Sequence, residues 1–253
     1  MTITTAKIPQ DHPRAKSLHT REMLVDGFRR NLVVSEGLIA HGRGEAFDYL
    51  IGERTSAAAI KAIRAAAATL LLPEKKTVLS VNGNTAALCP REIVELSRVV
   101  GADIEVNLFY RTKDREYAIK DELEKHGAKN VLGVGERASA KIPELSSERR
   151  RVDPDGIYAA DIVFVPLEDG DRTEALARMG KTVITVDLNP LSRTAIAAHV
   201  TIVDNLVRAM PALVQQTQAL KGMDEKSLKK IINAFDNKRC VAQSLRKIRG
   251  GIA

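Results

Sequence analysis

Cysteine, aromatic residues and long apolar segments are all scarce in this sequence. Among its 253 residues there are two cysteines, Cys89 and Cys240, no tryptophan and 4% aromatic residues. Two cysteines so far apart provide neither a disulfide framework nor a zinc site, which favours a reducing compartment. The longest apolar stretch, AAAATLLL, is far below the ~20 residues that span a bilayer. The N-terminal MTITTAKIPQDHPRAK also has no apolar core of a signal peptide. We therefore expect a cytoplasmic protein with no membrane partner.

The charge balance is basic. Lysine and arginine number 39 against 32 aspartates and glutamates, which gives a formal net charge of +7. Such an excess favours anionic partners, whether nucleic acid, acidic lipid or small phosphorylated molecules, without choosing among them. The hydrophobic content of 44% and the charged content of 28% are typical of globular proteins. The length fits one large domain or two small ones.

Short β-branched runs alternate with helical stretches along the middle of the chain. The runs are almost continuously apolar, as expected of parallel strands that are buried on both faces. Strand–helix repetition of this kind implies right-handed crossovers and a doubly wound, Rossmann-like α/β sheet. The predicted strands are 77–83, 103–110, 130–135, 161–167, 182–188 and 199–203. The predicted helices between them are Pro90–Gly101, Lys113–His126, Arg172–Met179 and a short one after Pro190.

Helical extensions are predicted at both ends of this sheet. Two helices precede the first strand, at about Arg14–Asn31 and Arg54–Leu72, and the second is rich in alanine and stops before Pro73. After the last strand we expect a helix over Asn205–Lys221 and one long C-terminal helix over about 224–249. We predict a single α/β domain over 1–253. It comprises a helical segment at about 1–75, a nucleotide-binding sheet at about 76–221 and the C-terminal helix.

Polar clusters follow three of the predicted strands. Since ligands of doubly wound sheets bind beyond the carboxyl ends of the strands, these clusters are candidate site residues. Each is also explained by ordinary turn or helix-cap chemistry, although three at one edge favour a site. The clusters are Asn82, Asn84 and Thr85 after the first strand, Asp187, Asn189, Arg193 and Thr194 after the fifth, and Asp204 and Asn205 after the sixth.

Two other patterns suggest different functions. The segment 132–138, LGVGERA, fits the Gly-x-Gly-x-x-Ala pattern of dinucleotide-binding enzymes such as dehydrogenases. It follows the third strand rather than the first, and Glu136 would repel a pyrophosphate. The basic C-terminal helix is compatible with a nucleic-acid-binding module, but aromatic stacking platforms and known nucleic-acid motifs are missing. A solvated outer helix face explains it better, and we expect no nucleic-acid partner.

The segment 37–53, GLIAHGRGEAFDYLIGE, combines charges, glycines and apolar residues. Gly42 and Gly44 flank Arg43, and each glycine weakens a helix interior by roughly 1 kcal/mol. We interpret this Gly-Arg-Gly sequence as a turn at which the backbone and Arg43 close on an anion, because the guanidinium is a fixed fork suited to phosphate. His41 and Glu45 lie beside it.

Taken together, the motifs resemble one family. The strings IPQDHPRAKSLHTRE, GLIAHGRGEAFDYLIGE, SVNGNTAALCPREIVEL, NLFYRT, HGA and TVDLNPLSRTA…VTIVDNLVRAMP are similar to those of the archaeal 4-phosphopantoate–β-alanine ligases, or phosphopantothenate synthetases. The likeness covers nearly the whole chain and is weaker at about 140–160 and in the last thirty residues.

The resemblance implies an ATP-dependent amide synthesis in coenzyme A biosynthesis. The reaction joins 4-phosphopantoate to β-alanine and releases AMP and pyrophosphate, and the family implies a homodimer with a Rossmann-like fold. The alanine-rich helix and the C-terminal helix also present more apolar surface than one face of a sheet needs, so we expect a second copy of the chain to cover it, with the N-terminal helices near the interface. The ATP contacts that the family implies fall on Arg21, Arg43, Asp187, Leu188, Asn189, Arg193, Thr194, Asn205 and Leu206.

The chemistry of such a reaction adds further candidates. Arginines, here Arg21, Arg43 and Arg193, are expected to share with Mg²⁺ the stabilisation of the triphosphate. Asp187 is a candidate for the ribose hydroxyls. β-Alanine must attack as a free amine, and His41 and Glu45 are both candidates for the base. For the substrate we consider Arg111, after the second strand, and the loop with Asn82, Asn84 and Thr85.

Overall fold

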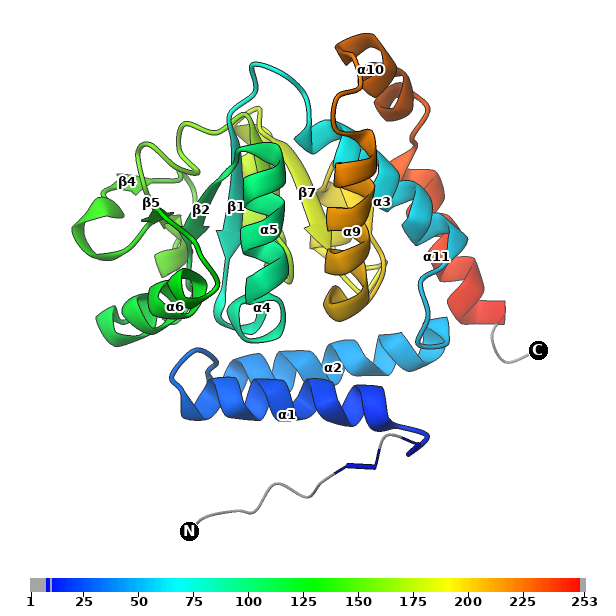
Figure 1. Ribbon diagram of the computed structural model, residues 1–253, viewed down its shortest axis with the longest axis horizontal. Coiled ribbons are helices and arrows are strands. Elements are labelled where there is room, and N and C mark those ends of the chain that lie inside the picture. The colour runs from blue at the N-terminus through cyan, green and yellow to red at the C-terminus, as the bar shows by residue number, and fades with distance from the viewer. Residues whose placement is uncertain (1–7, 10, 251–253) are drawn as a thin grey trace.

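Six parallel strands form the centre of the molecule (Figure 1). The computed structural model describes residues 8–9 and 11–250, and the ends of the predicted 1–253 domain lie outside them. The strands follow the order β3-β2-β1-β6-β7-β8. The chain therefore builds the sheet outward from β1 in one direction and then outward from β6 in the other, as in doubly wound nucleotide-binding folds.

All six predicted strands are present, each somewhat shorter than its apolar run. They are β1 (Thr77–Val81), β2 (Asp103–Val106), β3 (Val131–Leu132), β6 (Ile162–Phe164), β7 (Thr182–Val186) and β8 (Val200–Ile202). Their pairing is parallel throughout, with Leu79 of β1 opposite Ile104 of β2 on one side and Phe164 of β6 on the other. The predicted fold class is thus confirmed.

The segment between β3 and β6 contains elements that the sequence did not predict. Two short 3₁₀ turns, η1 (Gly135–Arg137) and η2 (Glu148–Arg150), accompany an antiparallel pair made of β4 (Ala140–Lys141) and β5 (Arg151–Val152). Glu105 of β2 is fully buried beneath this segment, where its carboxylate accepts the N–H groups of Asp153 at 3.0 Å and Ile157 at 2.6 Å. Burial raises the pKa of Glu105 to about 7.

The sheet separates two hydrophobic cores because side chains alternate along each strand. Leu79 and Val81 point to one core and Val78 points to the other. The first core is covered by α3 (Ala57–Leu70), α5 (Pro90–Val100), α6 (Lys113–Lys125) and α9 (Leu206–Leu220). The second is covered by α7 (Gly170–Arg178) and the segment 142–160, and it includes Ala198, which directly follows α8 (Arg193–Ala197).

A helical hairpin, α1 (Ala15–Arg29) and α2 (Ser35–Ile51), lies across the carboxyl ends of the strands (Figure 1). Within residues 8–9 and 11–76, three helices thus precede β1, where two were predicted. The Gly-Arg-Gly sequence is not a turn but part of α2, so this prediction was wrong. Tertiary packing offsets the helix penalty of the glycines, since α2 buries Glu45, Asp48 and Ile51 and ends only at Gly52, which has a φ of 82°.

A short helix, α4 (Gly83–Leu88), follows β1 where a loop was predicted. Asn82 caps it, since its side-chain oxygen accepts the Thr85 N–H at 3.0 Å. The buried α4 packs against α1, and Gly27 of α1 lies directly against Ala87. This contact fixes the hairpin over the end of β1.

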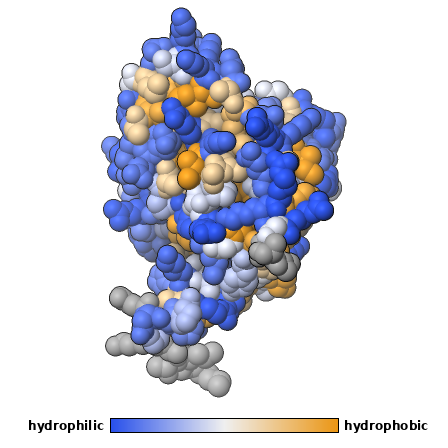
Figure 2. All heavy atoms as spheres, turned by 90° about the vertical axis from the view of Figure 1, so that its right-hand side faces the viewer, coloured by the Kyte–Doolittle hydropathy of each residue, from blue (hydrophilic) through white to orange (hydrophobic). Residues whose placement is uncertain are grey.

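The C-terminal region forms two helices rather than the single long one predicted. These are α10 (Glu225–Asn233) and α11 (Asn237–Gly250). The chain bends between them because the Asn237 side chain is tied to the sheet. It accepts the Thr201 N–H at 2.7 Å and donates to the Ala198 carbonyl at 2.9 Å. Figure 2 views this side of the molecule and shows a mostly hydrophilic surface with separate apolar patches.

The alanine-rich helix α3 is buried within the chain. It lies between β8, α9, α10 and α11, and ten of its fourteen residues are buried. The uncovered apolar face that we expected on this helix is therefore absent in the described part of the chain, apart from the exposed Ile60. No helix among residues 8–9 and 11–250 is long and apolar enough to cross a membrane.

Candidate functional site

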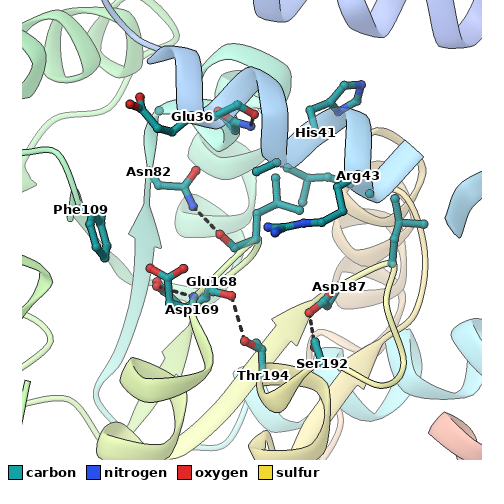
Figure 3. Close-up of a pocket in the computed structure, with 18 of the residues that line it drawn as sticks. Glu36, His41, Arg43, Asn82, Phe109, Glu168, Asp169, Asp187, Ser192 and Thr194 are labelled. Carbon is teal, nitrogen blue, oxygen red and sulfur yellow. Dashed lines mark hydrogen bonds between the residues drawn. The ribbon is translucent and has the colours of Figure 1, made fainter. Parts of the chain in front are cut away.

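A cavity of about 640 Å³ lies between the carboxyl edge of the sheet and α2. It sits where β1 and β6 are neighbours and the strand order reverses, which is the usual ligand position in doubly wound sheets. Figure 3 shows side chains converging on it from α2 and from the ends of several strands. The polar and charged residues that line it are Glu36, His41, Arg43, Asn82, Asn84, Tyr110, Arg115, Arg149, Glu168, Asp169, Asp187, Asn189, Ser192, Arg193, Thr194 and Asn205.

The ends of β7 and β8 form one wall of the cavity. Seven of the residues assigned to ATP lie there: Asp187, Leu188, Asn189, Arg193, Thr194, Asn205 and Leu206. Several of their polar groups already have partners. Thr194 donates to the Glu168 carbonyl at 2.8 Å, and the Asn205 amide donates to Asp48 at 2.7 Å. This wall is therefore preformed by hydrogen bonds to neighbouring elements.

Asp187 is held within its own turn. Its carboxylate accepts the Asn189 N–H at 2.9 Å and the Ser192 hydroxyl (Figure 3). Burial raises the pKa of Asp187, while the Ser192 hydroxyl, the Asn189 N–H and the Arg43 guanidinium oppose the rise. The arrangement orders the loop after β7, and it leaves the second lone pairs of the carboxylate as acceptors for a ligand.

Arg43 extends from α2 into the cavity (Figure 3). Its guanidinium forms no hydrogen bond or ion pair with the residues that the structure describes. By contrast, Arg193, which also lines the cavity, is ion-paired with Glu174 at 2.8 Å on the exposed side of the molecule. Arg43 therefore presents its full set of N–H donors to an anion in the cavity.

Arg21 and Glu45 lie outside the cavity. They form an ion pair of 2.7 Å between α1 and α2, which Tyr49 joins by donating its hydroxyl to Glu45 at 2.9 Å. Burial alone would raise the pKa of Glu45, but the Arg21 guanidinium and the Tyr49 hydroxyl lower it. The structure thus gives Arg21 and Glu45 the role of joining the two helices of the hairpin.

His41 lines the cavity, although its ring points away from Asp187 and Glu168 in Figure 3. Burial lowers the pKa of His41, so the imidazole is neutral at pH 7. Its buried Nε2 atom has no hydrogen-bond partner among the described residues. This ring nitrogen therefore keeps a hydrogen-bonding position that no described residue fills.

Four residues were considered for the substrate, and two of them, Asn82 and Asn84, line the cavity while Thr85 and Arg111 do not. Thr85 is fully buried beneath the cavity. Asn82 spans the junction of β1 and β6, because its amide donates to the carbonyls of Pro166 and Leu167 at 3.0 Å each. Asn84 donates to the Gly37 carbonyl at 2.9 Å and so binds α2 to the sheet.

Arg111 does not reach the cavity. It is buried in the corner between β2, α6 and β3, where it pairs with Glu116 at 2.7 Å and donates to the Gly133 carbonyl at 3.2 Å. Our expectation that it faces the substrate phosphate is not supported, because its charge is already compensated. The cavity instead exposes Arg115, one helical turn further along the chain.

Sequence reasoning overlooked the loop after β6. Glu168, Asp169 and Gly170 line the cavity, and Glu168 pairs with Arg149 at 3.0 Å and with Arg172. Asp169 also approaches Arg149, at 3.0 Å, and burial raises its pKa. The polar triplet after a buried strand is the same signal that identified the other three clusters. Arg149 had no such signal, since it lies in the irregular segment before β6.

The Gly-x-Gly-x-x-Ala pattern is a structural turn at the edge of the sheet. The N–H groups of Gly133 and Gly135 donate to Asp153 at 3.2 Å and Glu116 at 2.8 Å, where a pyrophosphate would bind in a dehydrogenase. Neither glycine lines the cavity. The pattern therefore gives no support to the dinucleotide-binding alternative.

Comparison with known proteins agrees with the resemblance seen in the motifs. A family model described as phosphopantothenate/pantothenate synthetase matches residues 58–251. The 4-phosphopantoate–β-alanine ligase of Thermococcus onnurineus is 53% identical over 243 residues, which are 96% of this chain and 92% of that protein. The proteins of the same name from Thermococcus kodakarensis and Methanosarcina mazei are each 51% identical over 96% of this chain, and the matches cover 92% and 94% of those proteins. This chain therefore belongs to the phosphopantothenate/pantothenate synthetase family.

Proposed function

We propose that the protein is an ATP-dependent ligase that condenses 4-phosphopantoate with β-alanine in coenzyme A biosynthesis. The observation that carries this proposal is the cavity at the reversal point of the sheet. The guanidinium of Arg43, which has no partner among the described residues, projects into it. Relatives that match almost the whole chain bear the name of this ligase. We expect the reaction to take place in the cytosol.

The reaction proceeds through an acyl-adenylate. The carboxylate oxygen of 4-phosphopantoate attacks the α-phosphorus of ATP, and the bond to the β-phosphate breaks to release pyrophosphate. The β-alanine amine then attacks the activated carbonyl carbon, loses a proton, and displaces AMP as the amide forms. Adenylation is needed because a free carboxylate is a poor electrophile, and the intermediate must be shielded from water.

In this scheme the chain contributes mainly charge and position. Arg43 neutralises the charge that develops on the phosphates, and the wall formed by Asp187, Asn189 and Asn205 holds the nucleoside. α2 covers the carboxyl edge of the sheet and limits the access of water. For the proton of the β-alanine amine, His41 is better placed than Glu45, since Glu45 is ion-paired and lies outside the cavity.

Mg²⁺ is expected to accompany ATP. In the part of the chain that the structure describes, no group of three or more histidine, cysteine, aspartate or glutamate side chains is arranged to hold a metal ion. Mg²⁺ needs fewer protein ligands than that, because it binds through one or two carboxylates together with phosphate oxygens. The side chain of Asp169, which lines the cavity and is 47% exposed, fits this requirement. When bound, the ion would neutralise triphosphate charge.

We also propose a homodimer. The helical hairpin carries exposed apolar side chains, among them Ile39 at 70% and Leu50 at 43%. They lie eleven positions apart, close to three helical turns, and so face the same side of α2. A second copy of the chain is the commonest partner for such a face.

Product analysis tests the proposed reaction. The wild-type protein is incubated with Mg²⁺, ATP, β-alanine and 4-phosphopantoate that carries oxygen-18 in its carboxylate. We expect phosphopantothenate, pyrophosphate and AMP that contains one labelled oxygen. Formation of ADP and inorganic phosphate would refute adenylation, and no condensation at all would refute the ligase. Thermal shifts with ATP, NAD and single-stranded RNA separate the alternatives, since only ATP with Mg²⁺ should stabilise the protein.

A further inference from the structure

Arg115, in the first turn of α6, is a buried cation that lines the cavity. Its exposed fraction is 6%, so it is withdrawn from bulk solvent. Its guanidinium donates one N–H to the Leu32 carbonyl at 2.9 Å and another to the Tyr110 carbonyl. The buried Nε atom has no partner within the described residues. A guanidinium has five N–H donors, so most of them have no partner in the part of the chain that the structure describes.

No carboxylate compensates this charge within residues 8–9 and 11–250. The other buried arginines differ in this respect: Arg111 pairs with Glu116, and Arg149 and Arg172 pair with Glu168. Glu36 also lines the cavity, but its carboxylate is hydrogen-bonded to Ser35 at 3.0 Å rather than to Arg115. Because an unpaired buried charge is costly, such a group points to a ligand that supplies the opposite charge.

The guanidinium is held firmly at this place. A Cβ atom on Gly83 would lie 2.8 Å from its Nη2, so only glycine leaves room for it beside α4. The neighbouring cavity residues come from α4 and from the end of β2, and include Asn84 and Tyr110. They lie across β1 and β6 from the wall at β7 and β8 that is assigned to the nucleotide. Arg115 therefore marks a second anion position in the same cavity.

We propose that Arg115 binds a phosphomonoester, namely the 4-phosphate of the acid substrate, and thereby selects 4-phosphopantoate over pantoate. This inference rests on the proposed function. The family description names both phosphopantothenate and pantothenate, so the choice between phosphorylated and unphosphorylated acid needs a structural cause in this chain. ATP offers phosphate of similar chemistry, and the test separates the two sources.

The test compares Arg115→Gln with the wild type in steady-state kinetics. We expect kcat/KM for 4-phosphopantoate to fall by roughly ten- to a hundredfold, the range for loss of a hydrogen bond to a charged group. The kcat/KM for pantoate and the KM for ATP should stay within about twofold, so that the preference for the phosphorylated acid collapses. A rise in the KM for ATP alone would instead place the triphosphate at Arg115 and overturn the proposal.

The matched control is Arg111→Gln. Arg111 is buried in the same part of the fold and also donates to backbone carbonyls, but it lies outside the cavity. We expect this variant to lose stability while its preference for the phosphorylated acid stays as in the wild type. An equal loss of preference in both variants would show that Arg115 acts only by supporting the fold.

A second measurement tests the proposal if the Arg115→Gln variant does not fold. Calorimetry compares the binding of 4-phosphopantoate, pantoate and inorganic phosphate to the wild-type protein. The same titrations are made on Arg115→Lys, which retains the charge. We expect pantoate to bind at least tenfold more weakly than 4-phosphopantoate, and inorganic phosphate to compete with 4-phosphopantoate but not with ATP. Equal binding of both acids would refute the role of Arg115. Binding with the expected preference but without product formation would refute the proposed reaction instead.

Discussion

At the scale of single residues, the arginines of this chain differ in whether they are ion-paired with a carboxylate, and this decides which of them can bind an anion. Arg21, Arg111 and Arg193 were all candidates for anion binding, and each is ion-paired to a glutamate. Arg43 and Arg115 carry no such partner in the described residues and both line the cavity. Arg149 and Arg193 line the cavity too, but both are ion-paired, so pairing distinguishes the cavity arginines that keep donors for a ligand from those that do not.

We expect Arg43→Lys to impair catalysis although the charge is kept. Lysine is a point charge and does not reproduce the planar, bidentate contact of a guanidinium with phosphate. Loss of one charge-assisted hydrogen bond should cost about 1.5–3 kcal/mol, or roughly ten- to a hundredfold in kcat/KM. Steady-state kinetics on the folded variant measure this. Arg29→Lys, at an exposed position near the end of α1, is the control, and equal turnover of the two variants would make Arg43 structural.

The sequence pointed to Arg43, which lines the cavity. After β2, however, it pointed to Arg111, whereas Arg115 lines the cavity. Both arginines follow β2, four positions apart, and the strand-end rule favoured the nearer one. The choice between them depends on Glu116, which draws Arg111 into the corner against β3. That corner is formed by residues distant in the sequence, including the Gly133 and Arg151 carbonyls. Local patterns therefore do not show which of the two arginines lines the cavity.

At the scale of elements, α2 determines the shape of the cavity, and its glycines differ in function. Gly37 faces Asn84, whose side-chain oxygen occupies the place of a Cβ atom, and Val33 lies 3.1 Å from that place. Around Gly42, in contrast, no atom lies within 4 Å of a Cβ in the described structure. The helix therefore approaches α4 through Gly37, whereas Gly42 is on an open side.

We expect Gly37→Ala to destabilise the protein by about 1–3 kcal/mol through overpacking and to lower activity by displacing α2. Gly42→Ala is the matched variant, and it should be neutral or stabilising by up to about 1 kcal/mol, since alanine favours the helix. Chemical denaturation and kinetics measure both effects. If Gly37→Ala proved as stable and active as Gly42→Ala, the contact with Asn84 would not position the helix.

The elements themselves followed from the sequence to very different degrees. Six strands and the helices between them were predicted because continuous apolar runs and end signals such as Pro90 and Gly101 are local. The break between α10 and α11 was not, because it depends on Asn237 bonding to residues around β8. α2 was missed for a similar reason, since the packing that offsets its glycines involves α1 and the distant α11.

At the scale of the whole molecule, the sequence predicted the cavity's location more reliably than its assembly. The rule for strand ends predicted the edge at which the cavity lies, because parallel strands bring their carboxyl ends together. The basis for the dimer was less secure, since α3 proved to be covered by α9, α10 and α11. The exposed apolar residues lie on the hairpin instead.

We expect a homodimer in solution whose interface includes α2. Light scattering at low micromolar concentration should give about twice the 27.6 kDa of one chain. The double variant Ile39→Asp/Leu50→Asp should shift the mass to that of a monomer, because buried unpaired carboxylates oppose association. Ile196→Asp, at an exposed position on α8, should leave the dimer intact. A wild-type mass of one chain that persists at rising concentration would disprove the prediction.

The position of β1 also governs the order in which the protein can fold during synthesis. β1 is the first strand to leave the ribosome, yet it ends up between β2 and β6. One edge of β1 can pair with β2 early. The other edge stays unpaired until Ile162–Phe164 of β6 have been synthesised, and an unpaired apolar edge favours mispairing. The hairpin of α1 and α2 is fixed in place later still, because Asp48 of α2 is hydrogen-bonded by Asn205 and Arg208, which follow the last strand of the sheet. The cavity is therefore completed only when nearly the whole chain has been translated.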